Sequence, residues 1–128
     1  MADGSDLFSL NYKEQDDIMV GVIQCENLDR GEAELIFGYY TEEAKNLPLF
    51  SDFILVTRKA VKVTSSAIGV LMKALDLMRK GKSYAILVMT ESLLNEIMLK
   101  FPEMFDFYAV FHTIEDAVTF IKKRRNNQ

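Results

Sequence analysis

The sequence predicts an α/β fold, in which a mostly parallel sheet of about five strands is covered by four helices. Short apolar runs alternate along the chain with amphipathic stretches of helical spacing, and repeated strand-helix units form parallel sheets through right-handed crossovers. The length of 128 residues suits one domain, and 49% hydrophobic and 27% charged residues are typical of a globular protein. The expected order is β-β-α-β-α-β-α-β-α.

The chain is expected to open with a β-hairpin. Residues 7–12 and 18–25 are apolar or alternating runs, and the polar residues 14–17 between them signal a turn. Asp29 and Glu32 then have the spacing of a capping box, followed by apolar residues at helical intervals. The first helix therefore follows the hairpin directly.

Three further strands are expected, each followed by a helix. Residues 53–56, 84–89 and 107–111 are continuous apolar runs, which are typical of strands buried on both faces. A second, shorter apolar pulse at Val61 and Val63 follows the first of these runs.

The helices after these strands have recognisable starts and stops. Residues 66–78 carry one apolar face, and Gly81 after them is a typical C-cap. Thr90 is placed to cap the next helix, which Pro102 ends, and Thr113 is placed to cap the last one.

The domain limits follow from the same pattern. We expect a flexible N-terminus over residues 1–6, a single domain over 7–125 and a tail over 126–128. The start is acidic and polar, unlike a secretory signal, and no apolar run approaches the ~20 residues that cross a bilayer. The sequence therefore predicts a cytoplasmic protein without a membrane partner.

Composition and missing motifs argue against several classes of function. A net charge of −4 disfavours nucleic acid as a partner, and Cys25, the single cysteine, allows no internal disulfide. Neither G-x-G-x-x-G nor G-x-x-x-x-G-K-[ST] occurs, and there is no G-x-S-x-G elbow. We therefore expect no enzyme activity, no cofactor and no metal.

The remaining polar residues have structural interpretations. His112 is interpreted as a boundary residue at the start of a helix. The basic residues 122–125 are placed to complement the dipole of the closing helix. The acidic pairs 16–17 and 42–43 diverge from each other and are interpreted as solvated carboxylates.

One segment carries a more specific signal. Residues 61–71 read Val-Lys-Val-Thr-Ser-Ser-Ala-Ile-Gly-Val-Leu. This segment resembles the Asp-Ser-Ser-Gly-Leu-Gly-Val-Leu segment of STAS domains in bacterial anti-sigma-factor antagonists, where a strand leads into a helix. The chain keeps both serines and the second glycine, Gly69, whereas Thr64 replaces the aspartate and Ala67 the first glycine.

Weaker matches extend the resemblance over most of the chain. Residues 26–29 look like the turn before the first helix of the family, and residues 80–82 like its Gly-Lys turn. Phe105 and residues 113–117 are similar to its closing Leu-Phe and Ser-x-Glu-Glu-Ala. The resemblance implies a STAS-like arrangement of the predicted elements.

The resemblance also implies a function, that of an anti-sigma-factor antagonist in a partner-switching pathway. In the family, the first serine is phosphorylated by an anti-sigma factor that is itself a serine kinase, and a serine phosphatase acts on the phosphorylated form. This role would fall on Ser65, with Ser66 and Thr64 as second choices. A hydroxyl at a helix start is accessible to a kinase, and the helix dipole there stabilises a phosphate.

The expected partner-binding surface surrounds this serine. Its residues are Asn27, Leu28, Asp29, Arg30, Arg58, Lys62, Thr64, Ser65, Ser66, Ile68, Gly69 and Met72.

The departures from the family pattern leave alternatives open. A second frequent aspartate of the family falls on Thr57, so both acidic positions near the serine are lost. Arg58, Lys59 and Lys62 stand there instead, either as a cationic rim that selects an acidic partner or holds a phosphate, or as a solvated strand end. The rival function is a STAS module that is not phosphorylated and serves as a scaffold or binds a small ligand. The two serines could also be simple capping residues.

Overall fold

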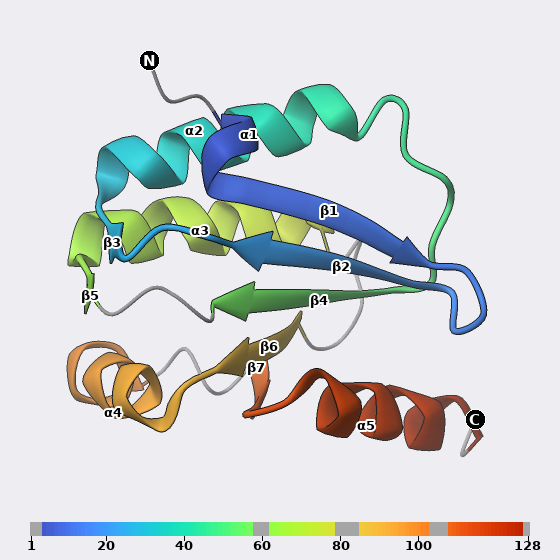
Figure 1. Cartoon of the computed structure of the whole chain (residues 1–128). Helices are drawn as coiled ribbons and strands as arrows, with labels where there is room; N and C mark the ends of the chain where they lie inside the picture. Colours follow the sequence, from blue (N-terminus) through green and yellow to red (C-terminus); the bar gives the residue numbers. More distant parts are fainter. Residues whose placement is uncertain (1–3, 58–61, 79–84, 103–107, 127–128) are drawn as a thin grey trace.

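The chain folds into a five-stranded sheet with helices on both faces (Figure 1). The computed structural model describes residues 4–57, 62–78, 85–102 and 108–126. Its elements are, in chain order, α1 (Gly4–Leu7), β1 (Phe8–Lys13), β2 (Ile18–Ile23), β3 (Asn27–Leu28), α2 (Arg30–Glu43), β4 (Asp52–Thr57), β5 (Lys62–Val63), α3 (Ser65–Met78), β6 (Ala85–Met89), α4 (Glu91–Lys100), β7 (Tyr108–Phe111) and α5 (Ile114–Asn126).

The main sheet has the strand order β1-β2-β4-β6-β7. β1 and β2 form the expected antiparallel hairpin, and all other neighbours in this sheet are parallel. β3 and β5 form a separate parallel pair of two-residue strands. The α/β class and the mostly parallel five-stranded sheet are therefore confirmed. The observed order also contains α1, β3 and β5, which the predicted order lacks.

Alternate residues of each central strand pack into two separate cores, because successive side chains on a strand point to opposite faces. α2, α3 and α4 lie over one face, where Leu55 of β4 belongs to the same apolar cluster as Leu75 of α3. α5 covers the other face, where Ile54 clusters with Ala117 and Ile121 (Figure 1). Both faces of β4 are buried, as its continuous apolar run predicts.

The predicted helix starts are present. Asp29 caps α2 in a complete capping box, as expected from its spacing to Glu32. The hydroxyls of Thr90 and Thr113 accept backbone N–H groups of α4 and α5 at 3.2 and 3.1 Å. These three caps are confirmed, while the C-cap predicted at Gly81 lies outside the described residues.

The parallel strands begin at one edge of the sheet, which we call the amino edge, and end at the opposite carboxyl edge. At the amino edge, Arg125 of α5 forms an ion pair with Asp52 of β4 at 2.8 Å. Its guanidinium also donates to the backbone carbonyls of Asp16 and Asp17, at 2.5 and 3.1 Å. Lys122 adds an ion pair with Asp16 at 3.0 Å. Two of the basic residues in 122–125 thus fasten α5 to the hairpin turn.

Asp17 is a half-buried acceptor, so the expectation of a solvated carboxylate is wrong for this residue. It adopts a left-handed conformation, with φ of 54°, which Asp tolerates better than most side chains. Its carboxylate accepts the hydroxyls of Ser51 and, at 2.7 Å, of Tyr12. These hydrogen bonds from Ser51 and Tyr12 lower the pKa of Asp17.

Candidate functional site

Ser65 is the first residue of α3 and lies at the carboxyl edge, where β5 leads into this helix (Figure 1). The β3–β5 pair holds the starts of α2 and α3 next to each other. In this pair, the backbone N–H of Lys62 donates to the carbonyl of Glu26 at 3.2 Å, and that of Thr64 to Leu28 at 3.1 Å. The position of Ser65 is therefore set by main-chain hydrogen bonds.

Thr64 caps α3 and joins it to α2. Its hydroxyl oxygen accepts the backbone N–H of Ala67 at 3.3 Å, and the hydroxyl donates to the carboxylate of Asp29 at 2.9 Å. Asp29 also accepts the backbone N–H of Arg30 at 2.8 Å. The hydrogen bonds from Arg30 and Thr64 lower the pKa of Asp29, so a carboxylate stands between the two helix starts at neutral pH.

The hydroxyls of Ser65 and Ser66, unlike that of Thr64, are not used in hydrogen bonds to described residues. Both residues are exposed. They lie in the first turn of α3, where backbone N–H groups have no acceptor within the helix and the dipole is positive. Of three adjacent hydroxyls, the two serines are available for modification, and Thr64 is committed to the cap.

The structure brings most of the predicted contact residues to one exposed surface around Ser65. The exposed members are Asn27, Asp29, Arg30, Lys62, Thr64, Ser65, Ser66 and Gly69. Leu28 and Ile68 are buried, and Met72 is half-buried. These apolar side chains belong to the core or pack against it beneath the exposed residues. Arg58 and Lys59 lie outside the described residues.

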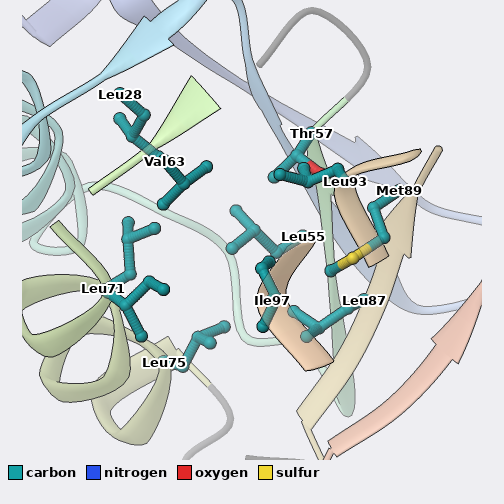
Figure 2. A pocket seen from close by; sticks show the side chains of 11 residues that line it. Leu28, Leu55, Thr57, Val63, Leu71, Leu75, Leu87, Met89, Leu93 and Ile97 are labelled. Carbon is teal, nitrogen blue, oxygen red and sulfur yellow. The ribbon is translucent and has the colours of Figure 1, made fainter. Parts of the chain in front are cut away.

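A small apolar cavity lies beneath this surface, between the sheet, α3 and α4 (Figure 2). Its volume is about 30 Å³, and Leu28, Val63 and Ile68 are among its lining residues. The hydroxyl of Thr57 also faces it and donates to the carbonyl of Val88 at 3.3 Å. Small-molecule sites usually measure about 300 Å³ or more, so this cavity is too small for the ligand of the rival hypothesis.

Charges around Ser65 are mixed. Arg30 forms an ion pair with Glu34 at 2.8 Å, and Lys62 is exposed. Lys100, the last residue of α4, also lies here, and its ammonium donates to the carbonyl of Val63 at 3.4 Å. No local pattern in the sequence predicts this position for Lys100. This lysine lies 37 positions along the chain from Val63, and only the packing of α4 against β5 brings it to the carboxyl edge.

The remaining titratable side chains of the described residues have structural surroundings. Within the described ranges, no group of three or more His, Cys, Asp or Glu residues is placed to hold a metal ion. Burial raises the pKa of the Cys25 thiol, which keeps it protonated. His112 follows β7 directly, and its Nδ1 lies 2.8 Å from the carbonyl of Met89, in agreement with a boundary role.

None of the helices in the described part of the chain combines the length and the apolar content needed to cross a bilayer. Comparison of the chain with family models, with curated proteins and with solved structures gives no match. A functional assignment therefore rests on the sequence pattern and on the geometry at Ser65.

Proposed function

We propose that this protein is an anti-sigma-factor antagonist of the STAS class, a binding module controlled by phosphorylation of Ser65. In this proposal the unmodified protein binds an anti-sigma factor that is a serine kinase, and the sigma factor is thereby released. Phosphorylation ends the binding, and a serine phosphatase restores the unmodified form. ATP belongs to the kinase, and the protein itself catalyses nothing.

One observation favours the two serines over Thr64 as the site of phosphorylation. The hydroxyl of Thr64 is engaged on both sides, as an acceptor from Ala67 and as a donor to Asp29. Ser65 and Ser66 are exposed at the start of a 14-residue helix. Between these two, the resemblance to the family favours Ser65.

The chemistry of the modification is a simple phosphoryl transfer. The Ser65 oxygen would bond to the γ-phosphorus of ATP as the bond between the β- and γ-phosphates breaks, so that ADP leaves and a base of the kinase takes the hydroxyl proton. The phosphate is stabilised by the positive start of α3. The domain can therefore carry the group without unfolding.

The effect on a partner is electrostatic. Before modification, the charges of Asp29 and Glu34 offset those of Arg30 and Lys62 among the described residues at the site. A phosphate adds about −1.5 to −2 charges next to the ionised Asp29, and the surface becomes anionic. A partner that packs against the unmodified surface would be repelled by the phosphate and would lose contacts that exclude water.

The proposal is tested by incubating the protein with ATP and with each purified serine kinase of its source organism. The added phosphate is located by mass spectrometry after proteolysis. We expect one phosphate on Ser65, none on Ser65→Ala, and unchanged labelling of Ser66→Ala. The same kinase should bind the unmodified protein and lose affinity for the phosphorylated form.

Two outcomes would contradict the proposal. Phosphate on Ser66 alone would show that Ser66, and not Ser65, is the phosphorylated residue. Binding of a partner without any phosphate on the three hydroxyls would favour the scaffold function.

A further inference from the structure

A groove runs between α2 and α3 on the side of the molecule that carries the start of α3. Its volume is about 370 Å³. It is lined by Arg30, Glu34, Phe37, Gly38, Val70 and Lys73. Arg30 is also the residue next to the cap Asp29, so the groove begins at the surface around Ser65 and leads away from it.

A glycine, Gly38, lies among the residues that line this groove. Gly38 is an exposed residue in the interior of α2, where glycine is less favourable than any residue except proline. A Cβ atom added at Gly38 would meet no atom within 4 Å beyond its two chain neighbours and the local helix backbone. Packing within the chain therefore does not require glycine here, and the space beside Gly38 is open. The half-buried side chains of Phe37 and Val70 line the same groove.

The two ends of the groove differ in charge. At one end, in the first turns of α2, Arg30 and Glu34 form an ion pair and neutralise each other. Lys73 is exposed at the other wall and has no ion pair with any residue that the structure describes. An apolar floor with one uncompensated cation complements an apolar side chain that is followed by a carboxylate.

We propose that this groove is a second contact for the partner kinase, which inserts an apolar side chain over Gly38 and places an adjacent carboxylate at Lys73. This inference rests on the proposed function, because it assumes the same partner. Phosphorylation of Ser65 does not alter this second contact, because Ser65 does not line the groove. The groove determines which kinase binds, and Ser65 determines when it is released.

The chemistry of the groove is tested without the kinase. The ¹⁵N-labelled full chain is titrated by NMR with phenylbutyrate, which joins an apolar ring to a carboxylate, and separately with phenylbutylamine, its cationic counterpart. We expect shift changes at Gly38, Val70 and Lys73 with phenylbutyrate, and about fivefold weaker binding of phenylbutylamine. Equal shifts with both probes, or shifts elsewhere only, would overturn the proposed chemistry.

Two substitutions at Gly38 then separate the groove from helix stability. Gly38→Ala and Gly38→Leu both remove the unfavourable glycine, but only leucine fills the groove. We expect Gly38→Leu to weaken binding of the phosphorylating kinase about tenfold, and Gly38→Ala to change it little. Thr119→Leu on α5, at the opposite face of the sheet, is the matched control. Unchanged affinity of Gly38→Leu would overturn the docking role.

The docking role of the groove and the phosphorylation of Ser65 can be rejected separately. If the groove does not bind the kinase, Ser65 is still phosphorylated, and Gly38→Leu binds the kinase like the original chain. If Ser65 is not the phosphorylation site, no phosphate appears on it, while the probe titration still reports on Gly38 and Lys73. Lys73→Glu should reverse the preference between the two probes, since it replaces the cation by a carboxylate.

Discussion

The two edges of the parallel sheet are held together in different ways. At the amino edge, side chains from three distant segments form one network, in which the carboxylate of Asp52 is 12% exposed and pairs with Arg125. At the carboxyl edge, main-chain bonds of β3 and β5 and one shared cap fix the helix starts. The larger side-chain network therefore lies away from the surface whose charge phosphorylation is proposed to change.

The topology explains this division. In a parallel sheet, each strand leads at its carboxyl end into a loop and a helix start, and binding sites gather at that edge. The main chain already satisfies many polar groups there, so the hydroxyls of Ser65 and Ser66 remain available. At the amino edge the side chains are instead used for stability, because the end of α5 is held against the sheet there by Arg125.

The largest effect should come from the amino edge. Arg125→Ala removes the partner of a nearly buried carboxylate and the donor to two carbonyls, so we expect a loss of about 2–3 kcal/mol in the free energy of unfolding. Urea unfolding followed by circular dichroism measures this loss. Lys123→Ala, an exposed neighbour, should change it by less than about 0.5 kcal/mol. Equal effects of the two variants would contradict the importance of the network.

A smaller and pH-dependent effect is expected for Asp17→Asn, which tolerates the left-handed backbone. The pKa of Asp17 is lowered in the folded chain, so its contribution to stability is present above the unfolded pKa and is lost as pH falls through the folded pKa. The free energy of unfolding should therefore decrease more steeply below about pH 5 for the original chain than for Asp17→Asn. Parallel curves from urea unfolding across this range would exclude a role for this carboxylate.

At the carboxyl edge, Thr64→Val tests the shared cap. Valine has nearly the same shape but can neither accept from Ala67 nor donate to Asp29, so we expect a loss of about 1 kcal/mol in stability. Thr64→Ser keeps the hydroxyl and should retain most of this stability. Thermal unfolding of the two variants makes the comparison, and a loss in Thr64→Ser as large as in Thr64→Val would show that the methyl group matters instead.

The smallest change in stability is expected for Ser65→Ala. The side chain is exposed and its hydroxyl bonds to no described residue, so the free energy of unfolding should change by less than about 0.5 kcal/mol. Phosphorylation, in contrast, should be abolished. A large loss of stability in the urea titration of Ser65→Ala would indicate that this serine caps the helix, as Thr64 does.

Much of the fold could be predicted from local patterns. The hairpin, the capping box of Asp29 and the caps at Thr90 and Thr113 depend on residues close together in the sequence, and all are present. The start of a helix at Ser65 follows from the same reasoning. The phosphoacceptor role of Ser65 is a different matter, since it depends on resemblance and remains a prediction.

Local sequence patterns are sufficient to set the periodicity of each element, the helix starts and the position of two serines before an amphipathic helix. Tertiary packing, in contrast, brings Thr64 to Asp29, Lys100 to Val63 and Arg125 to the hairpin turn. These contacts join residues 35, 37 and 109 positions apart. Local propensity has no information on such pairs, because their geometry exists only after the strands have paired and the helices have packed.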